Sequence, residues 1–168
     1  MNSRKIGLLI INGPLPPPYG GIATYLAHVL PYLAKHGFEV HTITDQKPSD
    51  SQAHAAYESQ GVHIHYSRLT KTMKVLKAFK HVPFCVSVIR NSHLPLLDLL
   101  KTLASMIGWL EAGEAVLQTE EIDIIHAYDY PWVQGYVGVY LAREYKKKIV
   151  QSTFGEVVPH IEELIQHD

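Results

Sequence analysis

Residues 5–35 read KIGLLIINGPLPPPYGGIATYLAHVLPYLAK, and this stretch decides the fold. Its first eight residues form an almost continuous apolar run, which is typical of a strand buried on both faces of a parallel sheet. Four prolines and three glycines follow between positions 13 and 21, where they exclude both helix and strand. Apolar residues then recur with a helical period as far as Lys35. Strand, glycine-rich turn and helix together predict a doubly wound α/β fold.

The remainder of the chain continues this alternation of strands and helices. Gly37 is predicted to cap the first helix, and Pro31 is predicted to kink or break it. Pro83 should end a helix that begins near position 70, and Gly108 and Gly113 could interrupt a longer one. Such alternation predicts a parallel sheet of order 3-2-1-4-5, with its ligand crevice between strands 1 and 4. We expect strands at 38–44, 62–66, 122–126 and 148–152, and helices at 22–36, 51–60, from about 70 to just before Pro83, 92–118 and 132–145.

Composition narrows the class of protein. A chain of 168 residues is expected to form one domain, residues 1–168, with a single core. The net charge of −1 predicts no nucleic-acid partner. Cys85 is the only cysteine, which fits a reducing compartment, and no apolar run is long enough for a membrane span, so we expect a cytoplasmic protein. The 11 histidines show no metal-site spacing, and we expect no metal and mostly exposed imidazoles.

The clearest candidate site is the pair Gly20-Gly21 at the start of the first helix. Glycine lets a ligand approach the backbone closely, and a helix amino end attracts phosphate. The spacing is neither a dinucleotide fingerprint nor a P-loop, so a classical NAD or ATP site is disfavoured. A tight turn without any ligand explains the same residues equally well.

Two further polar turns are expected at the same edge of the sheet. His126 could exchange a proton near neutral pH, and Asp129 could orient it or bind a hydroxyl. Alternatively, His126 only closes its strand and Asp129 only caps the next helix. Gly155 and Glu156 belong to the third turn, which follows the fifth strand.

Two surfaces suggest a role in binding rather than catalysis. The helix near position 70 carries a basic row, which is either a solvated face or a surface that rests on anionic lipid headgroups. The long helix after it is expected to cross over the core and to leave some apolar surface for a partner. The basic row is Lys71, Lys74, Lys77 and Lys80, and the apolar face is Leu94, Leu97, Leu100, Leu103, Ile107 and Leu110.

Three segments together resemble the amino-terminal domain of the two-domain (GT-B) glycosyltransferases of family 4. That family opens with P-x-x-G-G-I/V, a helix and G-H-E-V-x-V/L-I/V-T, and this chain has PPYGGI at 17–22 and HGFEVHTIT at 36–44. DIIHAYD at 123–129 resembles the family's D-I/V-I/V-H-x-H-D/E, and residues 148–155 resemble its V-x-T-x-H-G strand. The resemblance covers essentially the whole chain.

The resemblance implies a retaining transfer of sugar from a nucleotide-sugar donor to a sugar or lipid-linked acceptor, with no cofactor and no required metal. The amino-terminal Rossmann-like domain would shape the acceptor site, and a carboxyl-terminal domain would hold the nucleotide. Gly20 and Gly21 would then face the donor diphosphate. His126, Asp129 and Gly155 would line the cleft.

Two departures from the family pattern modify this expectation. The sequence ends before a carboxyl-terminal donor-binding domain with its E-x7-E motif, so we expect a fragment that is inactive as an isolated chain. Tyr128 stands where the family often has a cleft histidine, and a tyrosine is a poor base at neutral pH. Phe154 likewise stands where the family often has histidine. The alternative is a non-catalytic binding or scaffold module that uses the basic row, the apolar face and peripheral membrane contact.

Overall fold

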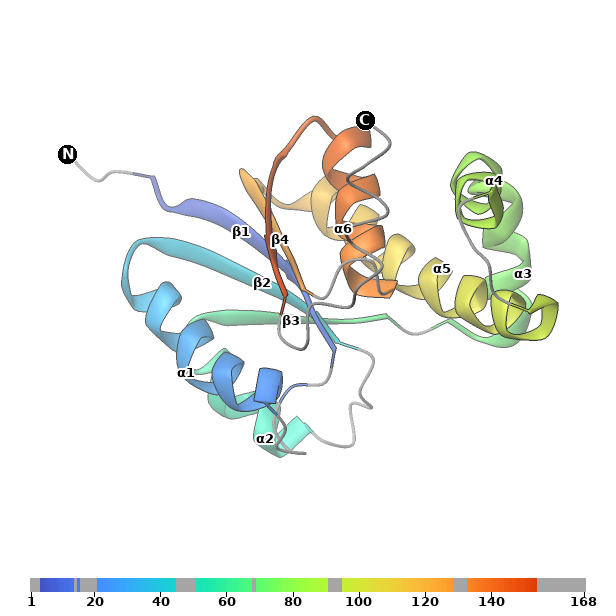
Figure 1. The fold of residues 1–168 in the computed structure, drawn as a ribbon. Helices are drawn as coiled ribbons and strands as arrows, with labels where there is room; N and C mark the ends of the chain where they lie inside the picture. The colour runs from blue at the N-terminus through green and yellow to red at the C-terminus, as the bar shows by residue number, and fades with distance from the viewer. Residues whose placement is uncertain are drawn as a thin grey trace.

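The computed structural model describes residues 4–13, 15, 21–44, 51–67, 69–90, 95–128 and 133–153. It confirms the predicted α/β fold and strand order, with one sheet of five parallel strands in the order β3-β2-β1-β4-β5. The fold is therefore a doubly wound, Rossmann-like sheet (Figure 1). The strands are β1 (Ile6–Ile11), β2 (Phe38–Thr44), β3 (Val62–Tyr66), β4 (Ile124–Tyr128) and β5 (Lys148–Ser152).

Helices cover both faces of the sheet. In Figure 1, α1 and α2 lie on one face and α5 and α6 on the other, while α3 and α4 extend beyond the sheet against the first half of α5. No helix within the described ranges is long and apolar enough to cross a membrane. The helices are α1 (Gly21–Lys35), α2 (Ser51–Glu58), α3 (Lys71–Lys80), α4 (Val82–Arg90), α5 (Leu96–Thr119) and α6 (Val133–Glu144).

The central strand explains the apolar run that opens the chain. Leu8 and Ile10 pack into one cluster of buried residues with α1, whereas Leu9 and Ile11 pack into another with α5 and α6. Successive side chains of a strand point to opposite faces, so a strand covered on both faces must be apolar throughout. Gly37 caps α1 as predicted, with a φ of 91° that favours glycine.

Glycines and prolines inside the helices do not break them, so the breaks considered in the sequence analysis do not occur. α1 continues through Pro31, and α5 continues through Gly108 and Gly113. These two glycines instead allow close packing: a Cβ on Gly108 would lie 2.6 Å from the Ser67 carbonyl oxygen. Gly113 faces the side chain of Leu141 on α6 in the same way.

The region between β3 and β4 agrees with its prediction at one point and differs at two others. The helix that begins near position 70 ends at Lys80, before Pro83 as predicted, and Pro83 lies in the first turn of a second helix, α4, where proline is tolerated. The apolar face of the long helix is not wholly in the core, since Leu97 is 72% exposed. β4 begins two residues later than expected, at Ile124, although Asp123 N already donates a 2.8 Å hydrogen bond to the Gly7 carbonyl.

Candidate functional site

The crevice predicted for this fold lies where β1 and β4 end side by side. Ile11 of β1 pairs with Ala127 of β4, and the chain then leaves toward α1 on one face and α6 on the other. This reversal of strand order is the usual ligand-binding position in open α/β sheets. Gly13 lies close to the start of α6, because a Cβ on it would be 3.7 Å from Gln134 Nε2. The amino end of α6 therefore lies beside the chain where it leaves β1.

Gly21 is the first residue of α1, and it is exposed. Apart from its chain neighbours and the backbone of α1, no atom of the described residues lies within 4 Å of a Cβ built on Gly21. The unpaired N–H groups of the first helical turn and the helix dipole favour an anion at this position. Its predicted partner Gly20 lies outside the described residues.

A buried amide holds the end of β1, and sequence reasoning missed it. The Thr42 hydroxyl donates a 2.7 Å hydrogen bond to Asn12 Oδ1, and Asn12 Nδ2 donates a 2.8 Å bond to the Gly13 carbonyl. Asn12 and Thr42 are both fully buried. These bonds fix the direction in which the chain leaves the sheet. The sequence feature that could have indicated this contact is a single amide residue, Asn12, at the end of an apolar run.

His126 lies on β4 and is half-buried. Its Nε2 is 2.9 Å from the hydroxyl oxygen of Ser152 on β5, and its ring stacks on Tyr128 with centroids 4.4 Å apart. Burial lowers the pKa of His126, which keeps the imidazole neutral near pH 7. A neutral imidazole can accept a proton, so the geometry permits the predicted acid–base role.

Tyr128 is a packing residue rather than a base. It is 1% exposed, and its ring meets Tyr25 of α1 edge to face with centroids 6.4 Å apart. Burial, and then the neighbouring Tyr25, raise the pKa of Tyr128 far above neutrality. The two tyrosine rings connect His126 to the first turns of α1. Asp129, Gly155 and Glu156 lie outside the described residues.

The histidines are more buried than the sequence suggested, and two groups could be considered for metal binding. Only three of the eight described histidines are exposed. In the first group, ligand atoms of Glu39, His41 and His63 lie within 4.8 Å of one another. The His41 and His63 rings are stacked, however, and His41 Nδ1 lies 3.1 Å from Nε2 of His65. The rings thus face each other rather than converging on one ion.

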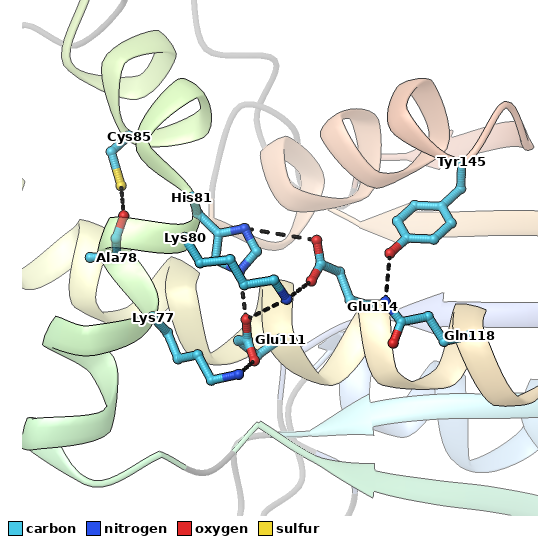
Figure 2. A network of polar contacts seen from close by, with 9 residues as sticks. All are labelled: Lys77, Ala78, Lys80, His81, Cys85, Glu111, Glu114, Gln118 and Tyr145. Carbon is cyan, nitrogen blue, oxygen red and sulfur yellow. Dashed lines mark hydrogen bonds and ion pairs between the residues drawn. The ribbon is translucent and has the colours of Figure 1, made fainter.

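The second group is an ion network that links α3 and α5 (Figure 2). Glu111 accepts hydrogen bonds from His81 Nε2 and lies 2.6 Å from Lys77 Nζ. Lys80 Nζ lies 2.6 Å from Glu114 and 3.1 Å from Glu111. Burial alone would raise the pKa of Glu111, but the bonds from Lys77, His81 and Lys80 outweigh it and lower the pKa to about 2. Lysines already neutralise these carboxylates, so the group is a structural network.

A shallow hollow lies between the end of β3 and α5, with Tyr66, Leu69 and Glu111 among its lining residues. Its volume is about 210 Å³. Ligand pockets usually measure roughly 300–1,000 Å³. We therefore assign no ligand to this hollow.

Comparison with known proteins adds an independent finding. The model of Glycosyltransferase Family 4 matches residues 19–157, which include every described helix and every described strand except β1. No curated protein shows a significant match to the chain. The family match covers most of the chain and is consistent with the Rossmann-like fold. The chain therefore belongs to glycosyltransferase family 4.

Proposed function

We propose that this chain is the acceptor-side domain of a retaining GT-B glycosyltransferase that uses a nucleotide-sugar donor. The observation that carries the proposal is Gly21, which is exposed at the start of α1 and has no side chain of the described residues where its own side chain would stand. An anionic diphosphate fits there because the helix amino end offers unpaired N–H groups. Those groups would stabilise charge on the departing diphosphate, an effect worth about 3 kcal/mol for one donor.

In this proposal His126 lies on the acceptor side of the reaction. Its neutral imidazole is held by Ser152 and stacked on Tyr128, so it has a fixed orientation at the carboxyl edge of the sheet. Asp129 follows Tyr128 directly in the sequence and is assigned to the same cleft by the family motif. A second domain would bind the nucleotide, and the isolated chain would not turn over. Sugar transfer by the purified chain alone would overturn that last point.

The decisive experiment places leucine at Gly21 in the complete enzyme, isolated as the assembly that the source cells make. Transfer from radiolabelled UDP-, GDP- and ADP-sugars should be lost in Gly21→Leu, while the thermal unfolding midpoint stays close to that of the wild type. The matched control is His28→Leu, which adds the same side chain at an exposed position two turns along α1. Full turnover in Gly21→Leu would contradict the assignment of this site.

A non-catalytic binding module is the second candidate, and the structure changes how it would work. Lys77 and Lys80 of the basic row pair with Glu111 and Glu114, so these two lysines are not open to a partner. Apolar side chains are exposed instead, on α3, α4 and the start of α5. This candidate predicts that the native assembly transfers no sugar from any of the donors above and that Gly21→Leu leaves its binding unchanged.

A further inference from the structure

Exposed apolar side chains are concentrated on α3, α4 and the start of α5. Ten of the sixteen large apolar residues that are exposed among the described residues lie between positions 73 and 100. We call these ten residues the outer apolar face. A monomeric protein rarely exposes so many apolar side chains in one region unless something covers them. The members exposed by more than half are Val75, Leu76, Phe79, Leu96, Leu97 and Leu100.

The orientation of α3 makes this face conspicuous, because the helix is amphipathic and turns its apolar side outward. Lys77 and the neighbouring Lys80 point toward α5, where Glu111 and Glu114 receive them (Figure 2). Phe79, on the opposite side, is 75% exposed. An amphipathic helix at a protein surface normally turns its apolar side toward the core. α3 has the reverse orientation, so its apolar side forms part of the protein surface.

α4 and the start of α5 present the same character beside it. Phe84 and Val88 of α4 are buried, while Val82, Val86 and Ile89 are exposed. The three helices touch one another, and Figure 1 shows α3 and α4 gathered with the first half of α5 away from the sheet. Because each backbone is helical, these segments satisfy most of their own hydrogen bonds, as a surface that enters an apolar environment must.

The charge of the same segment indicates what covers the face. Residues 68–101 contain seven Lys/Arg and one acidic residue, a net charge of +6. The rest of the chain contains eight Lys/Arg and fifteen Asp/Glu, a net charge of −7. Lys77 and Lys80 are paired with glutamates. The exposed cations near the apolar side chains are therefore other residues, such as Arg90 and Lys101. Lys101 has only an exposed partner, Asp98 at 3.3 Å.

We propose that α3, α4 and the start of α5 dock on the surface of an anionic lipid bilayer. The outer apolar face would enter the headgroup region, and the surrounding cations would contact lipid phosphates. A second copy of this chain is a poorer occupant, because the same positive segments would then face each other. The docking does not depend on sugar transfer. Its consequence, that the acceptor is carried by the membrane, rests on the proposed function.

Vesicle flotation of the full-length chain tests the docking directly. The chain should float with vesicles of phosphatidylcholine and phosphatidylglycerol, and salt should weaken the binding. Vesicles of phosphatidylcholine alone should bind at least about tenfold less, because each basic residue near an anionic surface contributes about 1 kcal/mol. Absence of binding to the anionic vesicles at low salt would overturn the proposal, whatever the outcome of the transfer assays.

Variants distinguish lipid binding through the outer apolar face from nonspecific adsorption to vesicles. Phe79→Ser/Leu97→Ser changes two exposed side chains on different helices and should reduce binding about tenfold or more. Tyr32→Ser is the matched control, because Tyr32 is exposed on α1, on the other side of the sheet. Arg90→Glu should weaken binding to anionic vesicles, whereas Lys35→Glu on α1 should not. Lys77 is unsuitable for such a test because its substitution breaks the pair with Glu111.

Two outcomes would assign the face to another occupant. Equal flotation of the wild type and Phe79→Ser/Leu97→Ser would show that the outer apolar face does not contact lipid. A dimer in analytical ultracentrifugation that becomes monomeric in the same variant, without vesicle binding by the wild type, would show that a second copy covers it. Each result overturns the proposal without bearing on the Gly21 site.

Discussion

Glu111 of α5 accepts a 2.6 Å hydrogen bond from His81, the residue that joins α3 to α4. The His81 side chain is 4% exposed and the Glu111 side chain 14%. Glu111 also pairs with Lys77 and Lys80, so one carboxylate fixes how the α3–α4 unit sits on α5. This contact turns the lysines of α3 inward and leaves its apolar residues outside. The first prediction concerns that carboxylate.

Glu111→Gln should destabilise the protein by about 2 kcal/mol, because it leaves partly buried cations without their carboxylate. The measurement is the free energy of unfolding in urea, with the m-value monitored for partial unfolding. Asp98→Asn is the control, since the Asp98–Lys101 pair is exposed and should matter little. Equal stability of Glu111→Gln and the control would show that the network does not hold α3 and α4 in place.

Stability should fall as the pH drops from about 6.5 toward 4, because His65 resists protonation in the fold. Burial, and then the neighbouring His41, lower the pKa of His65 to about 4. The unfolded chain binds this proton near pH 6.5, so acid favours the unfolded state throughout the interval. In His65→Gln the slope of unfolding free energy against pH should shrink by up to about 1.4 kcal/mol per pH unit, the linkage of one proton.

The two titrations should separate along the pH axis. Glu111 has a folded pKa of about 2, below that of a free glutamate, so its contribution is present above about pH 4.5 and is lost as the pH falls toward 2. Glu111→Gln should therefore change the slope below pH 4.5, and His65→Gln the slope above it. An unchanged slope between pH 4 and 6.5 in His65→Gln would contradict the assignment to His65.

Gly138→Ala should cost about 2 kcal/mol, because a Cβ on Gly138 of α6 would collide with the Ala127 side chain on β4. The partner change Ala127→Gly removes the atom that is struck. In a double-mutant cycle measured by urea unfolding, the two substitutions should therefore couple favourably by about 1 kcal/mol or more. Additive effects would mean that α6 relaxes away from the sheet instead.

His126→Gln in the complete enzyme should lower kcat/KM by about a hundredfold if its imidazole takes part in proton transfer. Since burial lowers the pKa of His126, the acid limb of the kcat/KM profile should have its midpoint below 6.5, the value of a free histidine. The limb should disappear in His126→Gln. Ser152→Ala, which removes only the hydroxyl 2.9 Å from His126 Nε2, should keep the limb. A limb that survives in His126→Gln belongs to another group.

The strand order and the position of the crevice could be predicted because they follow from local patterns. The apolar run before Asn12 permits only a strand covered on both faces, and alternating strands and helices leave few ways to connect a parallel sheet. Gly37 could be identified as a cap for the same local reason, since a positive φ suits glycine. Gly21 was found because it stands directly before a helical period.

The partners of the site residues could not be found in this way. Asn12 and Thr42 are 30 positions apart, and His126 and Ser152 are 26 apart, yet each pair is in hydrogen-bond contact. Contact between such residues depends on the pairing register of neighbouring strands, which no short sequence pattern contains. The burial of His41, His54 and His81 likewise became visible only once the elements were packed together.

The sequence by itself determined that α3 is a helix with a basic side and an apolar side. Only the tertiary structure decided which side faces the protein. The periodicity of a helical sequence identifies its two faces but does not show which element packs against each face. Glu111 and Glu114 lie three residues apart, on one side of α5, and they receive Lys77, Lys80 and His81. Because cations on a partly buried helix face require nearby carboxylates, that acidic pair fixed the lysines inward and left the apolar side exposed.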